Sequence, residues 1–138
     1  MSEERGTFSM RPIGVVRSAL HALADAPRQG DEGAPDAWIE LEASVLPACE
    51  GLVVGQEVLL FTWLDRARRD VLRVRPRDDA SRPLHGVFAT RSPDRPNPIG
   101  LHVVRIVELA RDRLRVGPLE AIDGTPVIDL EPVLGRER

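Results

Sequence analysis

The stretch EVLLFTWL, Glu57 to Leu64, is apolar at nearly every position and too short for a helix of ordinary length. Its β-branched and aromatic side chains, such as Val58, Phe61 and Trp63, favour an extended strand. A strand that is apolar at successive positions is buried on both faces or closes a barrel, whereas a strand with one wet face alternates apolar and polar residues. This stretch therefore predicts a buried strand at the centre of a β-fold.

Alternating segments surround this central strand. The clearest is Trp38–Leu46, where Ile39 and Leu41 alternate with Glu40 and Glu42. Further strands are predicted at Met10–Ser18, Asp70–Pro76, Gly86–Thr90, Leu101–Leu109, Arg113–Val116 and Val127–Val133. About eight or nine short strands, with turn residues between them and no long segment of helical period, indicate an all-β fold. We expect a small closed or partly closed β-barrel with long polar loops.

The length and composition are those of one globular domain. We expect 138 residues to form a single domain, with residues 1–9 and 135–138 frayed at its ends. No run of about 18 apolar residues is present, and the polar, acidic N-terminus does not read as a signal peptide. The single cysteine, Cys49, rules out an internal disulfide. These features predict a cytoplasmic protein with no membrane contact.

The histidines give no sign of a metal site. His21, His85 and His102 are scattered without the spacing of metal ligands, and one cysteine cannot complete a zinc site of the usual kind. We therefore expect no metal. His102 falls in a predicted strand, where a half-buried structural role is a simpler interpretation than a catalytic one.

Charge is unevenly distributed along the chain. The net charge of −3 argues against indiscriminate binding of nucleic acid. However, residues 66–95 hold nine arginines against four aspartates, whereas residues 25–57 hold eight acidic residues and Arg28 alone. If the fold gathers the basic block on one face, that face could bind phosphates. All 19 basic residues are arginine, so the block could equally be a solvated surface in an arginine-rich composition.

A stiff polar loop follows one of the predicted strands, in the stretch GVFATRSPDRPNPIG from Gly86 to Gly100. Its three prolines fix their own backbone and restrict the residues before them. Arg91, Asp94, Arg95 and Asn97 are therefore presented on a loop with little freedom left to lose on binding. Such a loop is a preorganised polar surface. The chain lacks the glycine-rich motifs of nucleotide-binding folds, a nucleophile elbow and a zinc protease motif.

This stretch resembles the signature of the TsaA-like (TrmO-type) tRNA methyltransferases, and the resemblance extends over most of the chain. Ile13–Ser18 is similar to the opening strand of that family, Pro27–Gln29 to its donor-binding loop, and Ile122–Leu134 to its closing segment. The resemblance implies a small β-barrel that binds S-adenosylmethionine and pairs with a second copy as a homodimer. The implied reaction is methylation of N6 of threonylcarbamoyladenosine in tRNA, next to the anticodon.

The resemblance also implies which residues contact the methyl donor. They are Pro27, Arg28, Gln29, Asp65, Arg66, Arg91, Leu101, Glu120, Ala121, Ile122 and Asp123. Arg28 and Arg91 could pair with the donor carboxylate, and Glu120 or Asp123 could answer its ammonium group or ribose hydroxyls. Leu101 and Ile122 would be apolar walls for the adenine.

The acceptor side is less constrained by the sequence. We expect Arg73, Arg75, Arg95 and Asn97 to contact the substrate. Methyl transfer depends mainly on placing donor and acceptor in line. The acceptor nitrogen must also lose a proton, for which Asp65 and Asp94 are candidate bases on reach alone.

Two departures from the family pattern leave other functions open. Gly55, Gln56, Glu57 and then Asp65 stand where family members have a phenylalanine-serine-histidine run followed by a strand ending in histidine. The larger bacterial members also carry a C-terminal α+β domain after the segment that ends here near Leu134. A methyltransferase of the same fold with a small-molecule acceptor, or a non-catalytic S-adenosylmethionine-binding barrel, are the alternatives.

Overall fold

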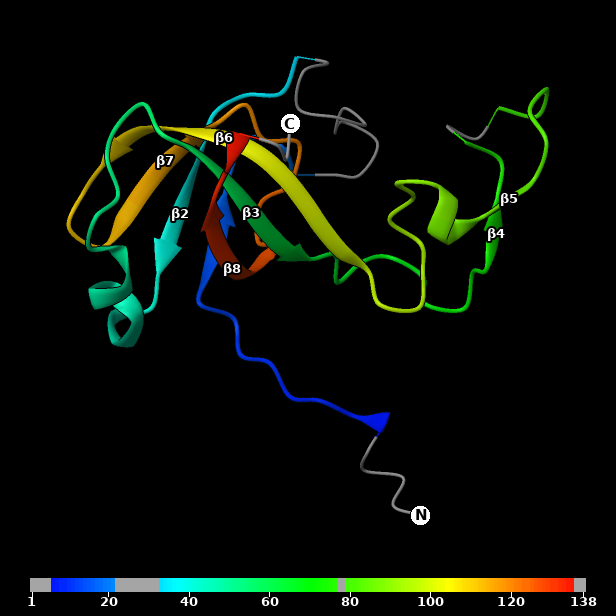
Figure 1. Cartoon of the computed structure of the whole chain (residues 1–138), viewed down its shortest axis with the longest axis horizontal. Coiled ribbons are helices and arrows are strands. Elements are labelled where there is room, and N and C mark those ends of the chain that lie inside the picture. Colours follow the sequence, from blue (N-terminus) through cyan, green and yellow to red (C-terminus); the bar gives the residue numbers. More distant parts are fainter. Residues whose placement is uncertain (1–5, 22–32, 77–78, 136–138) are drawn as a thin grey trace.

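A closed six-stranded antiparallel barrel dominates the computed structural model, which describes residues 6–21, 33–76 and 79–135. Around the barrel the strands run β1 (Gly14–Arg17), β2 (Ala37–Leu41), β7 (Arg113–Gly117), β6 (Ile99–Leu109), β3 (Glu57–Trp63) and β8 (Pro126–Pro132). Strand β8 pairs with β1 and closes the ring (Figure 1). The predicted small all-β barrel is confirmed.

The core fills the inside of the barrel. On β3, Val58, Leu60 and Thr62 are completely buried, while Leu59 and Phe61 between them are partly exposed. This alternation arises because successive side chains of a strand point to opposite faces. Burial of β3 on both faces, one of the two sequence-based interpretations, is therefore wrong, whereas the other, a strand that closes a barrel, is correct. The inner side chains pack with those of other strands, including Val16, Ile39, Val104, Ile106, Leu114, Val116 and Val127.

The predicted strand Trp38–Leu46 is too long. Strand β2 ends at Leu41, and Ala43–Cys49 form the 3-10 helix η4. Neither neighbouring strand continues beyond that point, because β1 begins at Gly14, opposite Leu41, and β7 begins at Arg113, opposite Glu40. An alternating sequence without a neighbouring strand does not extend the sheet. Of the helical segments that the structure describes, none has the length and apolar character needed to cross a bilayer.

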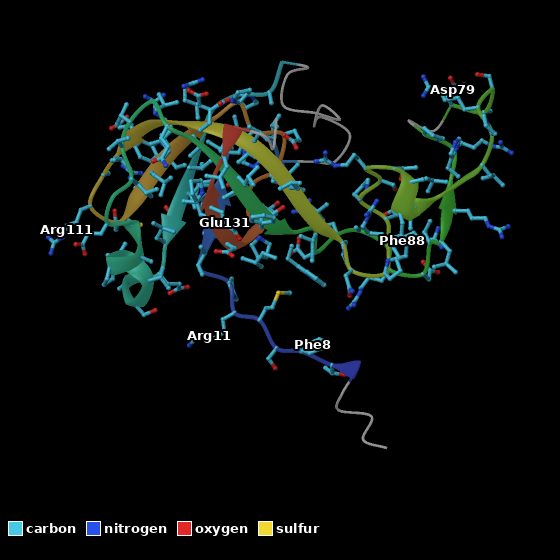
Figure 2. All side chains as sticks on the ribbon, viewed as in Figure 1. Phe8, Arg11, Asp79, Phe88, Arg111 and Glu131 are labelled. Atoms are coloured by element: carbon cyan, nitrogen blue, oxygen red, sulfur yellow. The ribbon has the colours of Figure 1, made fainter. Side chains whose placement is uncertain are left out.

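A second substructure leaves the barrel between β3 and β6, and we call residues 65–98 the arm. It contains the two-stranded pair β4 (Arg73–Val74) and β5 (His85–Gly86), followed by the 3-10 helix η6 (Val87–Ala89). Figure 2 shows Asp79 and Phe88 of the arm far from Arg111, which lies at the other side of the barrel.

The strands predicted in the arm are shorter than expected. The predicted segment Asp70–Pro76 keeps only two strand residues, Arg73 and Val74, and Gly86–Thr90 keeps only Gly86. The bond from the Val87 amide to the Leu72 carbonyl, 2.9 Å long, lies next to this short pair, and the chain then turns into η6.

The antiparallel register brings several connections to one end of the barrel, which we call the arm end. Strand β3 ends where β6 begins, with Trp63 opposite Ile99. At the same end β1 finishes, with Arg17 opposite Trp38 at the start of β2, and β7 runs into the connection 118–125 that leads to β8. Residues that are far apart in the sequence therefore meet at the arm end.

Candidate functional site

The arm end collects most of the residues predicted to contact a methyl donor. Asp65 and Arg66 follow β3, Leu101 lies near the start of β6, and Glu120–Asp123 lie in the connection between β7 and β8. Arg91 reaches this end from the arm through a contact with Leu101. The remaining predicted donor residues, Pro27, Arg28 and Gln29, lie outside the described residues.

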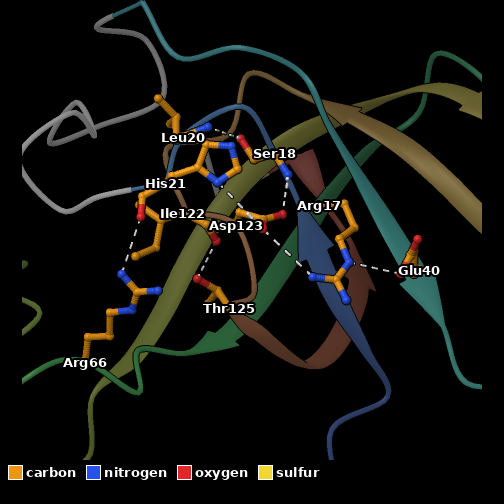
Figure 3. A network of polar contacts seen from close by, with 9 residues as sticks. All are labelled: Arg17, Ser18, Leu20, His21, Glu40, Arg66, Ile122, Asp123 and Thr125. Atoms are coloured by element: carbon orange, nitrogen blue, oxygen red, sulfur yellow. Dashed lines mark hydrogen bonds and ion pairs between the residues drawn. The ribbon is translucent and has the colours of Figure 1, made fainter.

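Asp123 joins the connection before β8 to the segment after β1. Its Oδ1 accepts a 3.0 Å hydrogen bond from the Ser18 amide, and its own amide donates to the Leu20 carbonyl at 2.6 Å. Its Oδ2 lies 3.8 Å from His21 Nδ1 and 3.9 Å from Arg17 Nη1 (Figure 3). The Asp123 carboxylate thus already has partners in the protein, and its first effect is to fix the shape of the site.

Asp123 is followed by a tight turn that depends on a glycine. Gly124 has a φ of 87°, a backbone conformation that glycine adopts without steric cost. The Thr125 hydroxyl donates a 2.7 Å hydrogen bond to the Ile122 carbonyl and closes the turn. Ala121 and Ile122 are buried, so these two predicted donor contacts lie at the inner surface of the connection.

Arg66 and Asp65 lie at the root of the arm. Arg66 Nη1 donates to the His21 carbonyl at 3.5 Å, which links the arm to the segment after β1. The Asp65 side chain is exposed, and its carboxylate has no partner among the described residues. The other candidate base, Asp94, accepts a 2.8 Å hydrogen bond from the Arg68 amide. Asp65 is therefore the more available of the two carboxylates.

Arg91 and Leu101, both predicted donor contacts, touch each other. Arg91 Nη2 donates a 2.8 Å hydrogen bond to the Leu101 carbonyl, and the side chain is otherwise exposed. A guanidinium carries five N–H donors, so most of them stay available for an anion. This contact fixes the direction of a cation beside the start of β6.

The stiff loop is held together by arginines. Arg95 Nη2 donates to the Val87 and Thr90 carbonyls, each at 2.6 Å, and Arg95 Nε donates to the Ser92 carbonyl at 2.8 Å. These bonds occupy Arg95 inside the loop, although the sequence analysis expects it to contact the substrate.

Asn97, another predicted substrate contact, is also engaged. Its Oδ1 accepts a 2.9 Å hydrogen bond from Arg69 Nη2, and Arg69 Nε donates to the Pro96 carbonyl at 2.7 Å. The Arg69 guanidinium lies 5.2 Å from the centre of the Trp63 ring. Arg69 therefore braces the loop against the end of β3, a role that its position in the sequence does not reveal.

The basic block is only partly free for phosphates. Arg68 forms a two-bond pair with Asp70, at 3.1 and 3.0 Å, and this hydrogen-bonded guanidinium lowers the pKa of the Asp70 carboxyl. Arg75 Nη1 donates to the Arg82 carbonyl at 2.8 Å. Arg73 is exposed, with no recorded partner in the part of the chain that the structure describes.

A buried polar cluster is the feature that the sequence analysis missed. His102 is 6% exposed, and its ring nitrogens contact Thr62 and Glu120. The expected half-buried position of His102 is therefore wrong. The alternation of side chains along a strand could have predicted this cluster. Thr62 continues the inward positions of Val58 and Leu60, and His102 on β6 lies opposite Leu60.

No candidate metal centre accompanies this cluster. Within residues 6–21, 33–76 and 79–135, no three histidine, cysteine or acidic side chains are close enough together to hold a metal ion.

Known proteins resemble this chain along most of its length. The family described as "tRNA-methyltransferase O N-terminal domain" matches residues 15–136. A probable S-adenosyl-L-methionine-binding protein of Methanothermobacter thermautotrophicus is 44% identical over 123 residues, which cover 89% of this chain and 88% of the relative. An S-adenosyl-L-methionine-binding protein of Archaeoglobus fulgidus is 46% identical over 125 residues, which cover 88% and 86%.

A solved structure shows the same fold. The crystal structure of TrmO from Pseudomonas aeruginosa aligns with a TM-score of 0.75 and 34% identity. The alignment covers 93% of this chain and 56% of the solved chain, so this chain spans little more than half the length of that protein.

Proposed function

We propose that this chain, which belongs to the tRNA-methyltransferase O N-terminal domain family, is a cytoplasmic S-adenosylmethionine-dependent methyltransferase. Its proposed acceptor is N6 of threonylcarbamoyladenosine in tRNA, next to the anticodon. The names of the two relatives support the choice of methyl donor. The name of the family supports tRNA as the substrate class.

One observation carries the proposal: the described residues expected to contact the donor converge on the arm end. Arg91 bonds to Leu101 at 2.8 Å, Arg66 donates to the His21 carbonyl, and the Asp123 carboxylate lies 3.8 Å from the His21 ring. These contacts join the arm, β6, the segment after β1 and the connection before β8. Four segments distant in sequence thereby form one surface that carries the exposed guanidinium of Arg91 and several carboxylates.

The side chains of this surface suit the proposed reaction. S-adenosylmethionine supplies an electrophilic methyl group when bound. Arg91 can donate further N–H groups to a carboxylate, and Glu120 can accept from an ammonium group. In this proposal Asp65, which is exposed at the root of the arm, takes up the proton that leaves N6 when the new N–C bond forms. The main task of the protein is to hold the two reactants in line.

A small-molecule acceptor is the second candidate, and the arm favours it in one respect. Arg69, Arg75 and Arg95 donate to carbonyls of the chain itself. Together with a net charge of −3, this leaves fewer free cations for a phosphate backbone than the sequence alone suggests.

The experiment that separates these candidates is a methylation assay with purified protein and labelled S-adenosylmethionine. We expect methyl transfer to tRNA that carries threonylcarbamoyladenosine and none to the same tRNA prepared without that modification. Arg91→Ala should weaken donor binding in calorimetry by about 1.5 to 3 kcal/mol, the range of a charge-assisted hydrogen bond. Donor binding without transfer to either tRNA would favour the small-molecule acceptor.

We also propose that two copies associate through the outer face of β6. Ile99, Leu101, Val103 and Val107 lie on that face, between 37% and 49% exposed. A hollow of about 440 Å³ next to it is lined by Phe61, Ile99 and Ile128 among others. Light scattering should find a dimer that Val103→Glu dissociates and that Val54→Glu, at an exposed position off this face, leaves intact. A fully active monomer at micromolar concentration would contradict this assembly.

A further inference from the structure

Three polar side chains, hydrogen-bonded in a row, cross the barrel wall at the arm end. The Thr62 hydroxyl lies 2.8 Å from His102 Nε2, and His102 Nδ1 lies 2.5 Å from Glu120 Oε1. Thr62 is completely buried, the His102 side chain is 5% exposed, and the Glu120 side chain is 19% exposed. This row of side chains therefore runs from the core outwards to the connection before β8.

The carboxylate fixes the hydrogen on the His102 ring. An ionised carboxylate can only accept hydrogen bonds, so Nδ1 carries the hydrogen and donates it to Glu120. In the neutral ring, Nε2 is then an acceptor for the Thr62 hydroxyl. Each polar atom of the ring thus has a partner, as burial requires.

Gly100, the second residue of β6, makes room for these three side chains. A Cβ added at Gly100 would lie 2.2 Å from Thr62 Oγ1 and 2.7 Å from His102 Nε2. Real side chains do not tolerate such distances, so any other residue would displace the hydrogen bond. The absence of a side chain at Gly100 is therefore needed for the contact between Thr62 and His102.

Glu120 differs from its neighbours in the connection. Leu119, Ala121 and Ile122 are all buried, whereas Glu120 is half-buried and holds His102 with Oε1 only. Its other oxygen, Oε2, has no hydrogen-bond partner among the described residues. One oxygen is bound to the buried histidine, which leaves the second for a further partner of this half-buried carboxylate.

We propose that His102 is a positioning residue for donor binding: it fixes Glu120 so that Oε2 is presented to a cationic group of the donor. The proposal rests on the proposed function, because it assumes that S-adenosylmethionine binds at the arm end. Burying a histidine, a threonine and part of a carboxylate is unfavourable compared with an apolar wall. Orienting the charge of Glu120 at the site would give this cluster a function beyond filling the core.

Two substitutions at His102 separate positioning from packing. In His102→Asn the amide nitrogen can take the place of Nδ1 and keep the bond to Glu120. In His102→Gln the longer amide can take the place of Nε2 and keep the bond to Thr62. Each variant loses one of the two hydrogen bonds of the ring, so their thermal stabilities should fall together.

The measurement is the dissociation constant for S-adenosylmethionine, by calorimetry without an acceptor. We expect His102→Asn to bind within about threefold of the wild type and His102→Gln to bind at least about tenfold more weakly, the loss of one charged contact. Equal affinities of the two variants would overturn the positioning role. If the wild type itself fails to bind the donor, the proposed function fails instead.

A measurement on the unaltered protein keeps the inference testable if the variants do not fold. Nitrogen NMR of ¹⁵N-histidine-labelled protein reports which ring nitrogen of His102 carries the hydrogen. The structure requires it on Nδ1, and addition of the donor should shift that signal because Glu120 gains a second partner. A hydrogen on Nε2 with Nδ1 unprotonated would overturn the inference, as would a signal that saturating donor leaves unchanged.

Discussion

The barrel and the arm are stabilised in different ways. Inside the barrel, large side chains such as Leu60, Ile106 and Leu114 are at most 1% exposed. In the arm, Phe88 and Leu72 are 83% and 66% exposed, and the loop is instead held by hydrogen bonds from Arg95 and Arg69 to backbone carbonyls. Burial of apolar surface gives the barrel its free energy of folding, whereas directional bonds give the arm its shape.

This difference indicates where substitutions should act. Among the described residues, the core cluster of the barrel includes none from the arm, so we expect the barrel to lose stability without any change in the contacts of Arg91. The arm can lose its shape while the barrel stays folded. The candidate site lies at the junction, where β3 ends and β6 begins. Loss of barrel stability and loss of the arm's shape should therefore both affect it.

The largest effect should follow from a cavity in the barrel. Ile106→Ala removes a side chain that is 1% exposed and should lower the free energy of unfolding by about 2 to 5 kcal/mol. Chemical denaturation measures this value. Val54→Ala, at a position that is 59% exposed and lies off the proposed dimer face, is the control and should cost far less. Equal losses in the two variants would mean that the barrel is not packed as described.

A smaller and more local effect should follow from Arg95→Ala. The change removes three hydrogen bonds to the carbonyls of Val87, Thr90 and Ser92. We expect faster amide exchange in residues 87–98 and lower methyl transfer, with exchange in β3 and β6 unchanged. Arg82→Ala, on an exposed arginine of the same arm, should leave loop exchange as in the wild type. Uniformly faster exchange across the barrel would show that the two regions unfold as one unit.

The smallest effect should come from the exposed arginines of β4 and its surroundings. If tRNA is the acceptor, replacing Arg73 and Arg75 with glutamine should raise the apparent KM for tRNA. It should also make the plot of log binding constant against log salt concentration less steep, by about one in slope for each lost phosphate contact. Donor affinity should stay the same. Arg111→Gln, at the far side of the barrel in Figure 2, is the control. Rates that depend on neither the substitution nor the salt would favour a small acceptor.

The barrel was largely predictable because its signal is local. Alternation at Ile39–Leu41 and the β-branched residues of Leu101–Leu109 both favour strands, and the structure places both segments in the barrel wall. Strand ends were harder to predict, because they depend on where a partner strand stops. The start of β1 at Gly14 and of β7 at Arg113 ends β2, and this pairing is not visible within the segment itself.

The candidate site was predictable as a list of residues but not as an arrangement. The resemblance supplied Arg91, Leu101 and Glu120–Asp123, which the fold brings to one end of the barrel. It did not reveal that Arg95 and Asn97 are engaged within the arm, because those bonds depend on how the loop folds back. His102 was underestimated because its two partners lie 40 and 18 positions away in the sequence.

The most direct test of the account is mass spectrometry of tRNA nucleosides from cells with and without this protein. The account predicts that N6-methylated threonylcarbamoyladenosine disappears when the protein is removed and that the unmethylated nucleoside accumulates. Both should return to their former levels with the wild-type chain and not with Arg91→Ala. An unchanged level of the methylated nucleoside in cells that lack the protein would contradict the proposed acceptor.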